Sequence, residues 1–439
     1  MPPPPTRRPA RAPDPPAAPA GRRLGPTVLV LSAVSLLTDL SSEIIYPLLP
    51  LFLTGVLGAG AEALGVIEGA AETTAALLKL ASGWWSDRVA RRKPLVLAGY
   101  GLASAVRPLV AFATVAWHVL AVRVLDRVGK GVRSAPRDAL IADATAPALR
   151  GRAFGVHRAA DHLGAVAGPL VAYALLEWLG LSLRTVFLWA AVPGAAAVLL
   201  VWLGVRETPR AVPPRAGQAA TVPGTGATTS AAASAAASAT THATTPGLAR
   251  RADPPRLGGA FWRYLAVVLV FTLGNATDAF LLLRASQLGV AVALVPLLWA
   301  MLHVVKSASS AIGGDLSDRL GRRPLIVVGW LIYALVYYLF ARASAPWHAW
   351  ALFATYGLYF GLTEGTEKAL VADLAPAAAR GTAFGWYNLA IGIGALPASV
   401  LFGVVWERAS PAAAFGLGAG LALTAAVGLL VLVPAPRRG

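Results

Sequence analysis

The sequence contains no cysteine among its 439 residues. Disulfide bonds, thiol chemistry and cysteine-based metal sites are therefore excluded. Charged residues are scarce as well, at 13% of the chain against about a quarter in soluble globular proteins. Hydrophobic residues make up 56%. A chain with so little polar surface cannot cover itself in water, so the composition favours an integral membrane protein.

Long apolar runs are abundant. A bilayer core of about 30 Å needs roughly 20 apolar residues per helix. Twelve runs of suitable length lie at about 27–50, 62–85, 94–116, 118–142, 153–176, 184–205, 264–287, 292–316, 324–343, 347–371, 383–406 and 411–433. The sequence thus predicts an all-α integral membrane protein with twelve transmembrane helices.

Positive charge is unevenly distributed along the chain, whose formal net charge is +17. Arg and Lys gather in the N-terminal tail, between residues 206 and 263 and at the C-terminus, whereas the loops near 54–61, 112–118 and 288–293 have none. Cytoplasmic loops carry such an excess, so we expect both termini and the central loop in the cytoplasm, and an inner or plasma membrane location. A nucleic-acid partner is not expected, because the basic residues follow the loops rather than a stripe with exposed aromatics beside it.

One short basic hairpin occurs twice. Residues 83–94 read GWWSDRVARRKP, and residues 314–324 read GDLSDRLGRRP. ALIAD at 139–143 likewise returns as ALVAD at 369–373, at an offset of 230. Several matches in register indicate a duplicated unit. Because each unit holds six helices, the two bundles share one orientation and should be related by a pseudo-twofold axis along the membrane normal.

The chain therefore divides into five predicted parts. Residues 211–250 are low-complexity Ala, Thr, Ser, Pro and Gly, which cannot bury enough surface to offset their ordering entropy. We expect a disordered tail at 1–26, a six-helix bundle at 27–205, a mostly disordered linker at 206–262, a second bundle at 263–433 and a tail at 434–439.

Three motifs resemble those of the major facilitator superfamily. Both hairpins resemble its helix 2–3 signature, G-x-x-x-D-R-x-G-R-R/K, with Ala90 in place of the second glycine of the first copy and Gly321 in the second. The matching residues are Gly83, Asp87, Arg88, Arg91 and Arg92, then Gly314, Asp318, Arg319, Arg322 and Arg323. Residues 123–131 resemble its helix 4 signature, with extra charges. Gly164, Gly168 and Pro169 resemble the G-x-x-x-G-P element of drug–proton antiporters.

This resemblance implies two six-helix bundles that rock about a central site lined by the first, fourth, seventh and tenth helices. It also implies secondary transport, with the helix 5 element favouring export. The energy source would be a proton gradient, and no cofactor is expected. The expected partners are a small solute, protons and membrane lipid, and nothing in the sequence requires more than a monomer.

Ionisable residues inside the predicted spans are the candidates for this chemistry. Each costs about 2.5–3.5 kcal/mol in lipid, so such residues usually face a cavity or a partner. We expect proton coupling or substrate binding from Asp39, Glu43, Glu68, Glu72, Arg123, Asp126, Lys130 and Asp278. A carboxylate that moves between water and protein changes its proton affinity, as coupling requires. For Glu68 and Glu72 the alternative is a permanent ion pair with Lys79 or with the bases of the fourth helix.

The two bundles are expected to attract each other through opposite charges. Arg133 and Arg137 lie toward the cytoplasmic end of the fourth helix, and the repeat places acids at or beside the equivalent positions. We therefore expect Arg133 and Arg137 to face Glu364 and Glu367 across the cavity mouth. Their rival role is binding an anionic substrate.

The hairpins are expected to act as a cytoplasmic gate. Asp143 and Asp373, at the ends of the fourth and tenth helices, are natural partners for the hairpin arginines. Such pairs would hold the cytoplasmic side closed while the outer side is open. The alternative is that the hairpin charges only set the membrane topology.

Asp161 is a candidate partner for Lys306 where the bundles meet.

The histidines are weaker candidates for function than the charged residues. His157, His162 and His303 titrate in a useful range, but lone helical histidines more often serve packing. His157 or His162 together with Asp161 would supply only part of a metal site, so no metal ligands are assigned and a divalent-metal substrate stays an alternative.

The sequence therefore predicts a proton-coupled secondary transporter working by alternating access, with export of a small solute as the leading interpretation. Import of an organic anion, favoured by the cations of the fourth helix, is the runner-up. A membrane enzyme is not expected, because no H-E-x-x-H or G-x-S-x-G motif occurs. A non-transporting sensor is the remaining alternative.

Overall fold

The computed structural model describes residues 24–86, 89–146, 149–207, 257–376 and 379–434. Within these ranges the regular structure is helical, and no strand occurs. The predicted tails, up to residue 23 and from residue 435, and most of the predicted linker lie outside the described residues. The division into five parts therefore stays a prediction at those segments.

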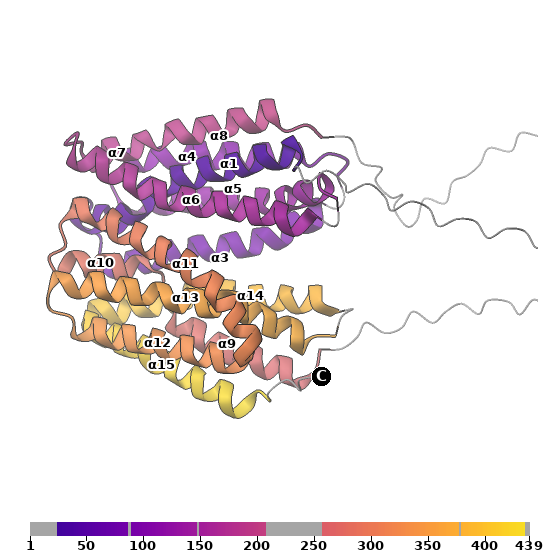
Figure 1. Cartoon of the computed structure of the whole chain (residues 1–439). Helices are drawn as coiled ribbons and strands as arrows, with labels where there is room; N and C mark the ends of the chain where they lie inside the picture. Colours follow the sequence, from indigo (N-terminus) through magenta and orange to yellow (C-terminus); the bar gives the residue numbers. More distant parts are fainter. Residues whose placement is uncertain (1–23, 87–88, 147–148, 208–256, 377–378, 435–439) are drawn as a thin grey trace, which may run out of the picture.

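Two bundles lie side by side, the first in indigo to magenta and the second in orange to yellow (Figure 1). The first contains α1 (Pro26–Ile45), α2 (Leu49–Leu51), α3 (Ala61–Ser86), α4 (Lys93–Val106), α5 (Ala116–Asp143), α6 (Arg150–Glu177), α7 (Leu183–Trp189) and α8 (Ala191–Gly204). The second contains α9 (Gly259–Gly274), α10 (Ala279–Gln287), α11 (Val295–Leu320), α12 (Arg322–Arg342), α13 (Pro346–Leu374), α14 (Arg380–Arg408) and α15 (Pro411–Leu432).

The predicted spans all coincide with helical segments of the described residues. Nine of these segments are long and apolar enough to cross a membrane by length and composition alone. The other three, α3, α5 and α13, have 26, 28 and 29 residues but are more polar. They match the predicted spans 62–85, 118–142 and 347–371 in position. The chain is thus an all-α integral membrane protein of two six-helix bundles.

Proline explains some of the irregular turns. The first helix becomes irregular at Pro47 and Pro50, because proline removes a backbone donor. The segment converts after α1 to a 3₁₀ turn at Tyr46–Leu48, resumes as α2, and closes with a π-helical turn at Phe52–Val56. Another break has no proline: the predicted helix 264–287 is interrupted at residues 275–278, between α9 and α10. Non-helical backbone at membrane depth is tolerated where it lines a cavity.

Two helix pairs make the main contacts between the bundles. Among the described residues, these most extensive contacts are α3 on α14 and α6 on α11, with smaller ones such as that of α10 with α2 beside them. Under the 230-residue repeat, α3 corresponds to α11 and α6 to α14, so a twofold operation exchanges these two contacts. This arrangement is the pseudo-twofold relation predicted from the sequence. The start of α1, the end of α8, the start of α9 and the end of α15 lie at the same end of the molecule (Figure 1).

That end also carries the turns from α3 to α4 and from α11 to α12, and we call it the hairpin end. Gly321 forms the second turn with φ of 95°, a conformation that side chains with a Cβ rarely adopt. The glycine of the signature is therefore required by the backbone in this copy. In the first copy the corresponding residue is Ala90, and the adjacent Asp87 and Arg88 lie outside the described residues.

Candidate functional site

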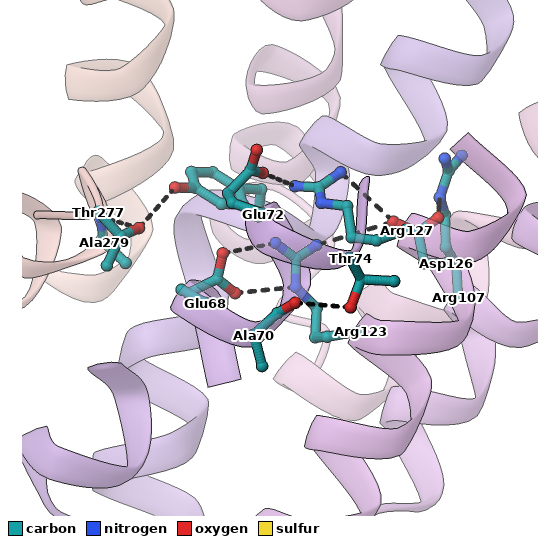
Figure 2. Close-up of polar contacts among 11 residues, drawn as sticks. Glu68, Ala70, Glu72, Thr74, Arg107, Arg123, Asp126, Arg127, Thr277 and Ala279 are labelled. Atoms are coloured by element: carbon teal, nitrogen blue, oxygen red, sulfur yellow. Dashed lines mark hydrogen bonds and ion pairs between the residues drawn. The ribbon is translucent and has the colours of Figure 1, made fainter. Parts of the chain in front are cut away.

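The centre of the first bundle holds a network of ion pairs between α3 and α5, all of whose members except Glu72 are buried (Figure 2). Arg123 donates from Nε to Glu68 Oε1 at 2.8 Å and from Nη2 to Oε2 at 2.6 Å. Arg127 Nη2 lies 3.0 Å from Glu72 Oε1. Bidentate guanidinium–carboxylate pairs of this kind add geometric specificity as well as energy. Two acids one turn apart in α3 thus pair with two arginines one turn apart in α5.

Asp126 connects this network to α4. Its Oδ1 accepts from Arg107 Nε at 2.7 Å, while its Oδ2 lies 3.5 Å from Arg127 Nη1 and 3.9 Å from Arg123 Nη1. Arg107 also donates to the Thr38 carbonyl of α1 at 3.1 Å. Asp126 is 1% exposed. A single buried carboxylate therefore holds three arginines, and the network ties α1, α3, α4 and α5 together.

The network is electrically balanced: Arg107, Arg123 and Arg127 face Glu68, Glu72 and Asp126. The predicted candidates Glu68, Glu72, Arg123 and Asp126 are therefore brought together. Their pairing matches the alternative that the sequence left open, an ion pair with the bases of the fourth helix. Whether they also carry protons stays a prediction.

A cavity of about 760 Å³ lies between the bundles. Its first-bundle wall includes Glu72, Lys79 and Lys130, and its second-bundle wall includes Asp278 at the break between α9 and α10. Other lining residues are Tyr46, Ser134, Asn275, Thr277, Phe360, Phe384, Asn388, Ile391 and Ser399. A space of this size suits a small organic ligand. Lys130 and Asp278 thus occupy the place that their predicted role requires.

The cavity extends toward the hairpin end and is closed toward the opposite end. Its lining reaches Leu80 late in α3 and Phe384 early in α14. At the opposite end α3 and α14 touch: a Cβ on Gly403 would lie 2.6 Å from the Ala61 carbonyl oxygen. The Glu407 carboxylate there accepts from the Glu62 backbone N–H at 3.0 Å. The structure therefore represents a state with access from one side.

A second line of acidic residues runs along the contact of α1 with α6. Asp161 accepts a hydrogen bond from Ser35. Gly164 packs against the turn of α1 that carries Asp39, and a Cβ atom placed on Gly164 would lie 3.1 Å from the Asp39 Cβ. Gly168 packs in the same way against Glu43, at 2.7 Å. The glycines of the antiporter-like element thus permit the close approach of α6 to the α1 carboxylates. Pro169 lies within α6 directly after them.

Three polar contacts of the described residues cross between the bundles near the cavity, and one of them runs from the Thr73 hydroxyl to the Gly392 carbonyl at 2.7 Å. Trp299 of α11 donates from Nε1 to Glu43 Oε2 at 2.7 Å. The Tyr46 hydroxyl lies 3.4 Å from the Thr277 hydroxyl. Trp299, Tyr46 and Thr277 were not predicted as site residues. Hydroxyl and indole groups at membrane depth are common in packing, and only the repeat offset of 231 between Tyr46 and Thr277 could have drawn attention to that pair.

Asp278 is held from the second bundle. Its Oδ1 accepts from the Tyr356 hydroxyl at 2.7 Å. Tyr356 belongs to a buried aromatic cluster in which the rings of Tyr333 and Tyr337 stack with centroids 4.1 Å apart. The sequence placed Asp278 alone on an apolar helix; the structure supplies its hydrogen-bond donor from α13.

The predicted attraction of Arg133 and Arg137 to Glu364 and Glu367 is not formed in this structure. The Arg133 guanidinium lies over the ring of Tyr100, 4.3 Å from its centroid. Arg137 Nη2 pairs with the adjacent Asp138 at 2.8 Å. Helical spacing placed the cations of the fourth helix on one stripe, but successive members turn toward different neighbours, so Arg133 and Arg137 face α4 and their own helix.

The two acids have partners of their own within the second bundle. Glu367 accepts from Trp330 Nε1 at 2.9 Å and from the Tyr387 hydroxyl at 2.7 Å. Glu364 lies 3.4 Å from Lys306 Nζ and 3.5 Å from Lys368 Nζ. The predicted pair of Lys306 with Asp161 is therefore replaced by a pair within the second bundle.

The hairpin pairs agree better with expectation. Arg92 pairs with Asp143, and Arg322 Nε lies 3.6 Å from Asp373 Oδ2. Arg323 donates to the Leu429 carbonyl of α15 at 3.2 Å. The role of these contacts as a gate stays a prediction. The same holds for Gly83, Arg91, Gly314 and Arg319. Asp87, Arg88 and the side chain of Asp318 lie outside the part of the chain that the structure describes.

The histidines do not assemble a site. His157 Nε2 lies 3.8 Å from Asp161 Oδ1 without a hydrogen bond, and the His303 ring packs edge-on against Trp299 with centroids 5.0 Å apart. In the described part of the chain, no three His, Asp or Glu side chains are grouped so that they could hold a metal ion. The geometry offers no support for a metal substrate.

Comparison with known proteins agrees with this architecture of a membrane transporter. The family described as the Major Facilitator Superfamily matches residues 31–399 and 264–439. An uncharacterized MFS-type transporter of Methanocaldococcus jannaschii is 30% identical over 417 residues, covering 94% of this chain and 95% of that protein. The chain therefore belongs to the Major Facilitator Superfamily of transporters.

A shorter relative and a solved structure add detail. Multidrug resistance protein MdtH of Yersinia enterocolitica is 37% identical over 95 residues, which cover 22% of this chain and 24% of that protein. The crystal structure of a D-xylose-proton symporter aligns with a TM-score of 0.70 at 17% identity, covering 94% of this chain and 98% of that one. At that identity the likeness concerns the fold alone.

Proposed function

We propose that this protein is a proton-coupled secondary transporter that exports a small solute from the cell by alternating access. The observation that carries the proposal is the cavity between the bundles, which is closed at one end by direct contact of α3 with α14. A transporter of this kind must close one end of a central site while the other is open. Family membership supports the transport itself.

Proton coupling is supported by the contact of Glu43 with Trp299. A hydrogen bond to a charged carboxylate is about twice as strong as one to a neutral group. A proton on Glu43 therefore weakens a contact that joins the two bundles. By linkage, any rearrangement that breaks the contact changes the affinity of Glu43 for the proton. The geometry thus ties protonation to the relative position of the bundles.

Export is supported by two observations. The partial relative MdtH is named a multidrug resistance protein. In addition, the glycines of the antiporter-like element lie directly against the α1 turns that bear Asp39 and Glu43. We further propose a cell-membrane location with cytoplasmic termini, a monomer, and no cofactor or enzymatic activity. The hairpin end, which carries most of the positive charge, would then face the cytoplasm.

The test uses proteoliposomes that contain a pH-sensitive dye. Organic anions, lipophilic cations and sugars are added in turn while internal pH is recorded. Export by antiport predicts that one class drives protons in the direction opposite to the solute, and that Glu43→Gln abolishes this flux. Asp138→Asn, which alters a half-exposed pair outside the cavity, is the control. Proton movement with the solute, or unchanged flux in Glu43→Gln, would contradict the proposal.

A second candidate is proton-coupled import of an organic anion. One observation favours it: Lys79 and Lys130 present positive charge to the cavity. The same experiment separates the candidates, because import by symport moves protons and solute in the same direction.

A further inference from the structure

Two lysines on the first-bundle wall of the cavity lack a counter-ion. Lys79 of α3 and Lys130 of α5 both line the cavity, and both side chains are exposed to it. Neither forms a hydrogen bond or an ion pair with another of the described residues. By contrast, three arginines of the same bundle, Arg107, Arg123 and Arg127, each pair with a carboxylate.

The neighbouring acids cannot neutralise them, because those acids are already committed. Glu68, Glu72 and Asp126 balance three arginines one for one. Lys130 also follows Arg127 by three residues and precedes Arg133 by three, and like charges at this helical spacing repel. Glu72 and Asp39 attract Lys130 through space, but neither of them forms an ion pair with it. An additional negative charge in direct contact with Lys130 is therefore favourable.

The opposite wall has a different character. Phe360, Phe384 and Ile391 contribute apolar surface, and Asn275 and Asn388 contribute neutral polar groups. The acid on that side, Asp278, already accepts a hydrogen bond from Tyr356. A ligand that spans the cavity thus meets cations on one side and mostly apolar or neutral groups on the other.

We propose, building on the transport function proposed above, that the substrate is an organic anion with an apolar or aromatic body. Its carboxylate, sulfonate or phosphate group binds between Lys79 and Lys130. Its body lies against Phe360, Phe384 and Ile391. The cavity of about 760 Å³ accommodates such a molecule. From the sequence alone, anion binding is only a rival role of Arg133 and Arg137, whereas this assignment places the anion site at two lysines that face the cavity.

A simpler interpretation is that the lysines are solvated cations that only help to set the topology. That interpretation accounts for Lys79, which lies near the end of α3. It does not account for Lys130, which lies one turn from Arg127 in the middle of α5, far from the loops that govern orientation. An ionised side chain at that depth is costly and usually marks a substrate pathway.

The test measures binding to the purified full-length protein in detergent, with no proton gradient. The probes are three molecules of similar shape and different charge: 1-naphthoate, 1-naphthalenemethanol and 1-naphthylmethylammonium. We expect the anion to bind about tenfold or more tightly than the other two, since hydrogen bonds to charged groups are the strong ones. Lys79→Gln and Lys130→Gln should each weaken naphthoate binding about tenfold, while Lys130→Arg retains it.

The matched control is Lys368→Gln, which removes a half-exposed lysine that already pairs with Glu364. It should leave naphthoate binding unchanged. Equal or tighter binding of the alcohol or the ammonium would overturn the assignment, as would absence of binding by all three at millimolar concentration. Normal naphthoate affinity in both Lys→Gln variants would do the same. Because no flux is measured, these outcomes are independent of the proton-flux test of transport.

Discussion

The two bundles share one fold but have opposite kinds of centre. Asp126 and Arg107 form an ion pair in the first bundle. The residues at an offset of 230 are Tyr356 and Tyr337, whose rings lie 6.3 Å apart in the second. The same two positions in a duplicated unit have therefore been filled by a charge pair in one copy and by an aromatic pair in the other.

The contrast extends through both cores. Of the twelve largest fully buried side chains among the described residues, nine belong to the second bundle, including Trp330, Tyr333 and Tyr356. Buried ionisable Asp, Glu and Arg side chains show the reverse: the described part of the second bundle has Glu367, whereas the first has Glu68, Asp126 and several arginines. One bundle is held by directional, charge-dependent contacts and the other mainly by packing.

We infer from this difference that the two bundles have different roles. Packed aromatic rings contribute large apolar area and are insensitive to charge. A buried ion pair is weak evidence for stability, but removing one member is costly because a charge is left without its partner. We therefore expect the first bundle to respond to a change of charge in the cavity, and the second to be the more rigid of the two. Four measurements test this difference between the bundles.

The largest effect is expected for Asp126→Asn. The substitution leaves three buried arginines with two carboxylates, and breaking a buried pair in this way costs about 3–5 kcal/mol. The free energy of unfolding, measured by denaturant titration in mixed micelles, should fall by that amount. Asp138→Asn, at a half-exposed pair on the same helix, should change it by less than about 1 kcal/mol. Similar losses in the two variants would show that the network is no more important than a surface pair.

The second prediction tests whether an aromatic pair can replace the ion pair of Asp126 with Arg107. Asp126→Tyr alone should be strongly destabilising. Combining it with Arg107→Tyr, which copies Tyr337 and Tyr356 of the other bundle, should recover about 1–2 kcal/mol because one uncompensated charge is removed. The unfolding free energies of both single variants and the double variant give the coupling. Strictly additive losses would mean that the two positions are not equivalent in packing.

A smaller loss is expected in the second bundle for Trp330→Phe. The ring still stacks on Phe271, but Glu367 loses one of its two donors. An unsatisfied buried group costs about 1–3 kcal/mol, so the loss should be below that of Asp126→Asn. Trp386→Phe, at a ring that is 43% exposed, serves as the control. A larger loss than in Asp126→Asn would reverse the ranking of the two cores.

The smallest effect concerns the contact between the bundles. Glu407 accepts a hydrogen bond at the N-terminus of α3, where a negative charge is worth about 0.3–1 kcal/mol. Glu407→Gln should weaken closure of the end opposite the hairpins. A single cysteine at Ala63, which lines a groove beside Glu407, should then react faster with a maleimide, by up to about fivefold. Glu177→Gln, at the exposed end of α6, should leave the rate unchanged.

The sequence was sufficient to predict the helices, the repeat and most members of the ionic network. Long apolar runs define membrane helices with little ambiguity, and the turns carry a repeated motif. Glu68, Glu72, Arg123 and Asp126 were recognisable because ionised residues in a span require a reason. The backbone break at 275–278 left no comparable signal, since neither proline nor glycine marks its interior.

The sequence predicted which residues belong to the site better than it predicted which of them contact each other. Helical spacing shows which residues of one helix share a face, but not which neighbour that face meets. Lys130 and Arg133 are one turn apart in α5, yet the first lines the cavity and the second lies over Tyr100. The contact of Trp299 with Glu43 joins residues 256 positions apart, and only the relative placement of the bundles creates it.

The uncompensated lysines have an electrical consequence. A potential of 100 mV acts with about 2.3 kcal/mol on each elementary charge that crosses the full membrane. When the empty protein changes the side to which its cavity opens, Lys79 and Lys130 move relative to that field without counter-ions from the chain. A bound anion cancels part of this charge. With the anion site proposed above, we therefore expect membrane voltage to bias the step without bound anion more strongly than the step with it.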